Sequence, residues 1–253
     1  MEKTEFYSYI FKRKSIRNYD LTPIDDATLK EILEYLNSLK PIYDDIKTEL
    51  KIISHDQVKR RMMKEAPHYI AVFSEVKKGY LTNIGYMLQQ ADLFLSANGF
   101  GSCWQGIPAP TSELLNSSSL EFIIFIAFGK PKDPGSLHRT SISEFKRKSQ
   151  SEITDINGAD ELLEVARIAP SATNSQPWFF TGNKGIIHAY SVKPGFIKRF
   201  MVKKYIPIDV GIAICHLKIA AEHFGKKTEI VFDKNAKMND HKGHEYVASL
   251  KME

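Results

Sequence analysis

Apolar positions recur along this chain with two periods, one typical of helices and the other of strands. Residues 81–97 and 208–224 carry apolar side chains on nearly every helical turn, and a glycine follows each stretch within two residues, so we expect two buried helices. Residues 122–128 are apolar on both faces, as a buried central strand would be. Further short apolar runs predict strands at 69–73, 179–181, 186–192, 229–232 and 246–250.

Polar residues and glycines mark the ends of these elements. Asp25 or Asp26 can cap a helix whose leucine and isoleucine side chains form one stripe. Residues 160–168 predict another helix, and the basic residues 55–66 are also expected to be helical. The sequence Gly-Asn-Lys-Gly at 182–185 predicts a hairpin. Helices and mostly antiparallel strands in this order predict an α+β sandwich.

Composition excludes several classes of protein. The chain has 253 residues, of which 43% are hydrophobic and 26% charged, as in an ordinary globular protein. A net charge of +5 is mild and favours small anionic cofactors over nucleic acid. The histidine spacings do not match a metal site, and Cys103, one of two cysteines, is expected to be a small apolar filler. No apolar run is long enough for a signal region or a membrane span, so we expect a cytoplasmic protein.

Residues 169–178, Ala-Pro-Ser-Ala-Thr-Asn-Ser-Gln-Pro-Trp, are the most informative part of the chain. A helix cannot continue through Pro170, so the chain must turn there. Small residues leave the backbone of the turn accessible, and Asn174 and Gln176 add amides that both donate and accept hydrogen bonds. Such a turn suits a flat heterocycle such as a flavin pyrimidine. An ordinary polar loop between a helix and a strand is the alternative that these residues leave open.

A second motif lies near the N-terminus, where residues 11–17 read Phe-Lys-Arg-Lys-Ser-Ile-Arg. In an extended segment, the alternating side chains of Arg13, Ser15 and Arg17 leave from one face. Two guanidinium groups and a hydroxyl that converge on one point can bind a phosphate. A solvated basic arm is the alternative for this segment taken alone.

Together, the two motifs resemble the flavin-dependent nitroreductase family, which pairs an Arg-x-Ser-x-Arg segment with a Pro-Ser-x-x-Asn-x-Gln-Pro-Trp turn. Residues 99–106 and 126–131 are similar to that family's glycine-rich segment and to the strand end that follows it. The resemblance spans most of residues 11–232 and implies a nitroreductase-like α+β sandwich. In ordinary members, two identical chains share two flavin sites, and the turn follows the phosphate segment closely. Here about 150 residues separate the two motifs.

An internal repeat accounts for this order. Phe-Lys-Arg-Lys-Ser occurs at residues 11–15 and again at 145–149. The sequence therefore predicts two nitroreductase-like halves, residues 1–144 and 145–253, which share one core as a single-chain pseudo-dimer. Ser151 stands where the first copy has Arg17, so the second copy has lost an arginine and we expect Arg147 to have no part in binding cofactor. One complete site remains, which predicts one FMN per chain.

The resemblance also implies which residues hold the cofactor. The phosphate is expected at Arg13, Ser15 and Arg17, with Arg139 nearby, and the ring system at Pro170, Ser171, Ala172 and Asn174. Gln105 and Gly106 are expected near the reactive edge of the ring. No side chain is expected to act as an obligatory acid or base, because the flavin performs the chemistry.

The activity implied is transfer of hydride from NADH or NADPH to FMN and then to a nitroaromatic, a quinone or a similar small acceptor. We expect a monomeric pseudo-dimer or a homodimer that binds neither nucleic acid nor a membrane. A flavin-binding carrier or sensor without turnover is the alternative, and the residues do not separate the two.

Overall fold

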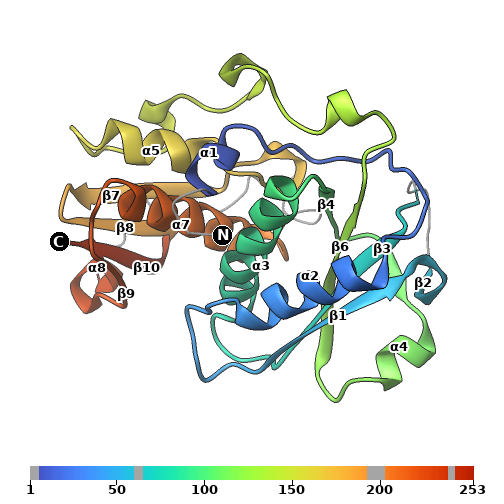
Figure 1. Cartoon of the computed structure of the whole chain (residues 1–253). Coiled ribbons are helices and arrows are strands. Elements are labelled where there is room, and N and C mark those ends of the chain that lie inside the picture. The colour runs from blue at the N-terminus through green and yellow to red at the C-terminus, as the bar shows by residue number, and fades with distance from the viewer. Residues whose placement is uncertain (1–5, 60–64, 193–202, 239–242) are drawn as a thin grey trace. The chain divides into compact units, whose positions relative to one another are not determined.

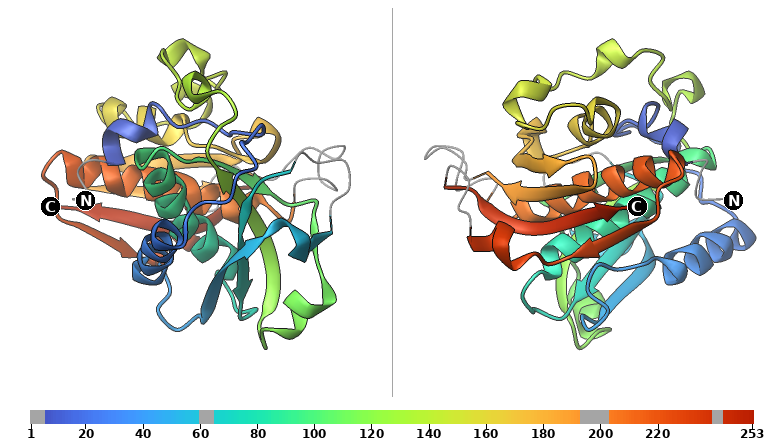
Figure 2. Two further views of the ribbon diagram at one scale, coloured as in Figure 1. Left: turned by 45° about the vertical axis from the view of Figure 1, so that its right-hand side comes forward. Right: turned by 90° about the vertical axis from the view of Figure 1, so that its left-hand side faces the viewer.

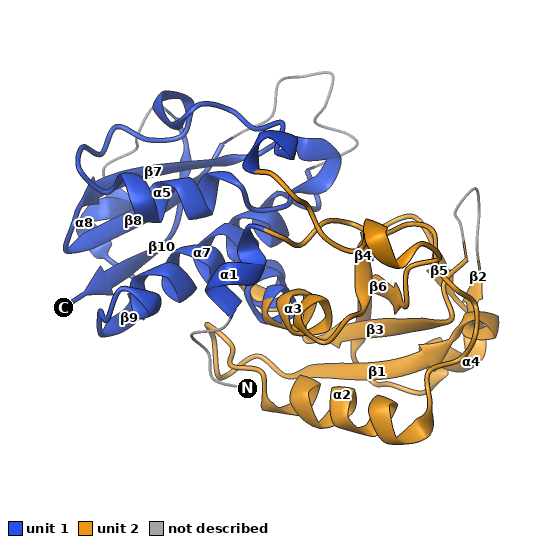
Figure 3. Ribbon diagram, turned by 45° about the horizontal axis from the view of Figure 1, so that its top comes forward, with its two compact units in different colours: residues 1–11, 81–89, 142–253 blue, residues 12–80, 90–141 orange. Residues whose placement is uncertain are grey.

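The computed structural model describes residues 6–59, 65–192, 203–238 and 243–253. It is an α+β protein, as the sequence predicts, with two four-stranded sheets and one two-stranded pair among the described residues (Figure 1). The chain divides into two compact units (Figure 3). Unit 1 comprises residues 1–11, 81–89 and 142–253, and unit 2 comprises residues 12–80 and 90–141.

The sheet of unit 2 is antiparallel throughout, with strand order β1-β3-β6-β4. The central strands β3 and β6 are apolar along almost their whole length and are buried, as expected for residues 122–128. The strands are β1 (Thr48–Ser54), β3 (His68–Ser74), β6 (Glu121–Gly129) and β4 (Gly101–Gln105). A separate pair joins β2 (Val58–Lys59) to β5 (Ala109–Pro110).

Two helices complete unit 2, and a third is shared with unit 1. In α2 (Asp26–Ser38), the carboxylate of Asp25 accepts a hydrogen bond from the Thr28 N–H at 2.9 Å, which is the predicted cap. The short helix α4 (Ser112–Asn116) precedes β6. The long helix α3 (Tyr80–Ala97) contributes residues 81–89 to unit 1 and its remaining residues to unit 2. Gly99 follows α3 with a φ of 83°, the left-handed conformation that favours glycine.

Unit 1 has an antiparallel sheet of its own, with strand order β7-β8-β10-β9. The strands are β7 (Trp178–Asn183), β8 (Ile186–Ser191), β10 (Glu245–Met252) and β9 (Thr228–Val231). The helix α7 (Ile206–His223) packs against this sheet (Figure 2). The shorter helices are α1 (Phe6–Ile10), α5 (Asp160–Arg167) and α8 (Lys234–Met238).

The two sheets repeat one topology. In chain order, β1, β3, α3, β4 and β6 correspond to β7, β8, α7, β9 and β10, and the corresponding strands take the same places in their sheets. Both central helices are 18 residues long. This correspondence is what a duplication produces. The proposed division between residues 144 and 145 stays a prediction.

Within unit 1, α3 and α7 cross at a reciprocal pair of glycines. A Cβ on Gly85 would overlap the carbonyl oxygen of Ile208, and a Cβ on Gly211 would overlap that of Thr82. Gly85 lies three residues after Thr82, and Gly211 lies three residues after Ile208, so the two contacts are equivalent. Reciprocal contacts of this kind are typical of a two-fold interface between like subunits.

Part of the sequence-based assignment is wrong. Residues 55–66 do not form the expected helix: His55–Gln57 form a short 3-10 turn and Val58–Lys59 pair with β5, while residues 60–64 lie outside the described part. These residues lack the apolar stripe that holds a helix to a core. The strands β1 and β4 were not predicted, because charged residues interrupt β1 and glycine begins β4. Among the described residues, no helix is long and apolar enough to cross a membrane.

The glycine crossing yields a prediction. Gly211→Ala should lower the free energy of unfolding by about 1–3 kcal/mol or more, because the added methyl group forces two helix backbones apart. Helix propensity alone predicts the opposite, because alanine in place of glycine would raise the free energy of unfolding by about 1 kcal/mol. Urea unfolding measures the difference. Gly135→Ala is the control, because its Cβ would meet only ordinary contact with Asp133 at 3.4 Å. A Gly211→Ala protein as stable as the wild type would contradict the crossing.

Candidate functional site

The segment that follows α1 is extended, as the alternation of its residues predicts. Arg13 forms an isolated β-bridge with His138, and Ser15 forms another with Ser102 at the start of β4. The N–H of Ile16 donates to the carbonyl oxygen of Ser102 at 2.9 Å. The bridges therefore fix this segment along β4 in unit 2.

The two arginines of this segment have different environments. Arg13 is only 3% exposed, and its Nε lies 3.0 Å from Oδ2 of the fully buried Asp92 in α3. Its Nη2 donates to Ser15 Oγ at 3.3 Å, and the Ser102 hydroxyl donates to Asp92. Arg17, by contrast, is exposed. The charge of Arg13 is thus already paired, whereas the guanidinium of Arg17 is exposed.

Sequence reasoning did not find Asp92. The available signal was a single carboxylate in the otherwise uncharged stretch 81–97, because a buried acid needs a partner. Removing one member of a buried ion pair typically costs about 3–5 kcal/mol of stability. Replacing Arg13 would therefore perturb the fold of unit 2 as well as any ligand.

Arg139 lies against the same segment, as expected from the resemblance. Its backbone N–H donates to the carbonyl oxygen of Lys12 at 2.7 Å, and its guanidinium donates to that of Arg13. Unit 2 therefore brings Arg13, Ser15 and Arg139 together. Cys103 follows Ser102 in β4, and burial raises the pKa of its thiol while the two arginines of the motif oppose this shift.

β4 ends at Gln105, the first of the two residues expected at the reactive edge. Its side chain is 3% exposed, and within the described residues its Oε1 has no hydrogen-bond partner. Gly106 is exposed just beyond the strand. A buried acceptor without a donor costs free energy, and a ligand N–H is one group that can satisfy it.

The turn motif lies in unit 1, between α5 and β7. The helix ends at Arg167, before Pro170, as predicted. Thr173, Asn174 and Gln176 have φ values of 53°, 57° and 48°, in the left-handed region that non-glycine residues rarely occupy. Such strain persists only where the surroundings hold it, and it is common at ligand sites.

Two side chains hold the ends of this turn. The hydroxyl of Ser171 accepts from the Gln176 N–H at 2.9 Å. The carboxylate of Asp209, near the start of α7, accepts from the Ala172 N–H at 3.0 and 3.2 Å. Trp178 follows the turn and is completely buried, so its side chain packs in the core. Asp209 was not predicted to contact the turn.

The second copy of the basic motif contacts this turn. Arg147 Nη1 donates to Asn174 Oδ1 at 2.5 Å, and Asn174 Nδ2 donates to the carbonyl oxygen of Lys146 at 2.6 Å. The Lys148 N–H donates to Gln176 Oε1 at 2.7 Å. The second copy was expected to have no part in binding cofactor, because it has lost one arginine, and this stays a prediction. The structure shows that the second copy hydrogen-bonds to both amide side chains of the turn.

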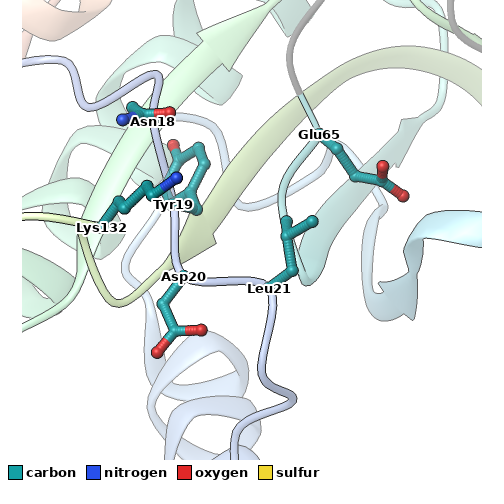
Figure 4. Close-up of a pocket in the computed structure, with 6 residues that line it drawn as sticks. All are labelled: Asn18, Tyr19, Asp20, Leu21, Glu65 and Lys132. Carbon is teal, nitrogen blue, oxygen red and sulfur yellow. The ribbon is translucent and has the colours of Figure 1, made fainter.

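A separate cavity of about 540 Å³ lies beside the residues that follow Arg17 in unit 2 (Figure 4). It is lined by Asn18, Tyr19, Asp20, Leu21, Glu65 and Lys132. None of the expected cofactor residues lines it. Within the described residues, no group of three or more histidine, cysteine, aspartate or glutamate side chains is placed to hold a metal ion.

The burial of Asp209 predicts a pH dependence. Burial raises the pKa of Asp209 well above its usual value, and the hydrogen bond from Ala172 only partly opposes this. The folded protein therefore holds a proton that the unfolded chain releases above a pH of about 3.9, so folding stability falls as pH rises from there to the folded pKa, by up to about 1.4 kcal/mol per pH unit. Asp209→Asn should remove this loss. Urea unfolding of both proteins between pH 4 and 7 measures it, and parallel stability curves would show that Asp209 has an ordinary pKa.

Three comparisons with known proteins bear on this site. A sequence model of the family described as "Putative TM nitroreductase" matches residues 5–221. Among curated proteins, none matches this sequence. Among solved structures, a putative nitroreductase from Thermotoga maritima MSB8 is similar over 98% of this chain and 93% of that one, with a TM-score of 0.68 and 23% sequence identity. That likeness shows a shared fold.

Two further solved structures are similar over shorter parts. A nitroreductase family protein from Clostridium difficile 630 matches 58% of this chain and 94% of its own, with a TM-score of 0.45 and 17% identity. An FMN-dependent nitroreductase from Clostridium difficile R20291 matches 49% of this chain and 87% of its own, with a TM-score of 0.41 and 17% identity. Because the family model covers most of the sequence, the chain belongs to the putative TM nitroreductase family and is an oxidoreductase of the nitroreductase type.

Proposed function

We propose that the chain binds one FMN and uses NADH or NADPH to reduce a nitroaromatic, a quinone or a similar small acceptor. The chemistry that bound FMN supplies is the transfer of a hydride from the nicotinamide to the acceptor. The protein's share is to bind, orient and shield the reacting groups. Protons are assigned to water or to the substrate, because no side chain is assigned as an acid or base.

The turn at residues 171–176 carries this proposal. Its three left-handed residues cost free energy of about 1–3 kcal/mol each, and an ordinary connecting loop would relax. Backbone N–H groups at its two ends donate to the Ser171 hydroxyl and to the Asp209 carboxylate, and these bonds maintain it. Asn174 is exposed, and its Nδ2 carries two hydrogens, of which the Lys146 carbonyl uses one. The turn therefore supports the assignment of Pro170, Ser171, Ala172 and Asn174 to the flavin ring.

Unit 2 contains residues whose charges and hydrogen-bond donors suit a phosphate. Arg17 presents an exposed guanidinium, and Ser15 and Arg139 lie half-buried around the same extended segment. Arg13, neutralised by Asp92, holds Ser15 in place more than it attracts an anion. Two oxygens of a phosphate group can accept paired hydrogen bonds from such a guanidinium. We assign the phosphate to this segment, with Arg17 as the dominant charge.

β4 supplies two further groups that fit a flavin. The unpartnered Oε1 of Gln105 can accept a hydrogen bond from a ligand N–H. The exposed Gly106 has no side chain to block close approach of a planar ring. A backbone N–H directed at the reduced ring would stabilise its negative charge.

Arg17→Ala tests the phosphate assignment. The substitution should weaken FMN binding by about 1.5–3 kcal/mol, or roughly 10- to 150-fold in Kd, which is the scale of hydrogen bonds to a charged group. Lys30→Ala is the matched control, because it removes an exposed cation from α2 in the same unit. Quenching of flavin fluorescence measures both constants.

The activity is tested with the wild-type protein and FMN in the absence of oxygen. Addition of NADH or NADPH should bleach the visible flavin absorption, and a nitroaromatic or quinone should restore it. A bound flavin that resists bleaching would support a carrier or sensor. A protein that binds no FMN would overturn the proposal, and equal losses in the two variants would overturn the role of Arg17.

A further inference from the structure

The second basic motif has changed partners relative to the first. In unit 2, Arg13 pairs with Asp92 of α3. The reciprocal glycines Gly85 and Gly211 align α3 with α7 at an offset of 126 residues, which places Lys218 where α3 has Asp92. Lys218 is a cation that pairs with Glu222 at 2.5 Å. The second copy therefore has no carboxylate at this position to receive Arg147.

Arg147 bonds to the turn instead. One terminal nitrogen donates to Asn174 Oδ1 at 2.5 Å, and the other donates to the carbonyl oxygen of Ile168 at 3.3 Å. The guanidinium thus spans the end of α5 and the left-handed part of the turn. A planar guanidinium with fixed donors fixes the spacing of the two acceptors, which a single ammonium group cannot do.

These contacts also fix the orientation of the Asn174 amide. Its oxygen faces the Arg147 guanidinium, and its nitrogen faces the Lys146 carbonyl. A flipped amide would place its NH₂ group against a donor and its oxygen against an acceptor, so only one orientation is satisfied. Gln176 is held in the same way, because its Oε1 accepts from the Lys148 N–H and its Nε2 donates to the Asn174 carbonyl oxygen at 3.1 Å.

We propose that Arg147 is a positioning residue that holds the 171–176 turn in its left-handed conformation and orients Asn174 for the flavin. The ligand in this inference, FMN, rests on the proposed function, whereas the contact between Arg147 and the turn does not. The repeated motif has thereby exchanged a phosphate-binding role for a supporting one. Loss of Arg147 should loosen the turn and weaken FMN binding, although the residue is not assigned any contact with the cofactor.

Hydrogen exchange without added FMN tests the contact. In Arg147→Ala, the amides of Ala172, Asn174 and Gln176 should exchange at least tenfold faster than in the wild type, while the β7–β8 amides stay protected. Lys146→Ala is the control, because the Lys146 side chain is exposed and only its carbonyl oxygen is used. Unchanged exchange in Arg147→Ala would overturn the inference.

A double-mutant cycle tests the effect on the cofactor. Arg147→Ala should raise the Kd for FMN about tenfold in the wild type and by clearly less in an Asn174→Ala background, because one of the two contacts of Arg147 is with Asn174. The positioning role would be overturned if the double variant raised the Kd by the product of the two single effects, or if Arg147→Ala left the Kd unchanged. A wild-type protein that binds no FMN would overturn the proposed function and the cofactor part of this inference, whereas the exchange experiment would still decide the contact.

Discussion

The close crossing of α3 and α7 is the constraint on which unit 1 depends. Because Gly85 and Gly211 have no Cβ, a backbone carbonyl of each helix occupies the space that a side chain on the other helix would need. The crossing fixes the N-terminal part of α7, and Asp209 lies only two residues before Gly211. Its carboxylate then holds the Ala172 N–H at the start of the strained turn. A backbone contact in the core thus determines the position of the segment that most resembles a ligand site.

A duplication would account for both the repeated topology and the differences between the two copies. The sheets keep the same strand order, and the two central helices keep equal length. At the sites, however, the halves differ by single charges. Asp92 binds Arg13 in unit 2, whereas Lys218 at the aligned position leaves Arg147 to contact Asn174. The two halves thus differ in the charge at one aligned helix position and in the partner of the repeated arginine.

Much of this fold could be read from sequence because its elements are strongly patterned. The helices at 81–97 and 208–224, the central strand at 122–128 and the 182–185 hairpin have continuous apolar runs or unambiguous turn residues. The edge strand β1 was not predicted, because Glu49 and Lys51 interrupt its apolar pattern. A helix was wrongly predicted at residues 55–66, because basic residues alone do not define a helix.

The site was less predictable than the fold. Motif spacing identified the extended segment and the turn, because both depend on local residue types. It could not show that Asp92 neutralises Arg13 or that Asp209 and Arg147 support the turn, since these contacts join residues far apart in the chain. A buried acid in an apolar helix was the only signal, and it occurs at both Asp92 and Asp209. A buried acidic residue indicates that the fold supplies it with a partner, but the sequence does not show which residue that partner is.

The central claim is that this duplicated chain retains a single functional flavin site. Its most direct test is the stoichiometry of FMN bound to the purified wild-type protein at saturation, measured by released flavin against protein concentration from amino-acid analysis. The account requires one FMN per chain. Two per chain would show that both copies of the site still function, and none would remove the site altogether.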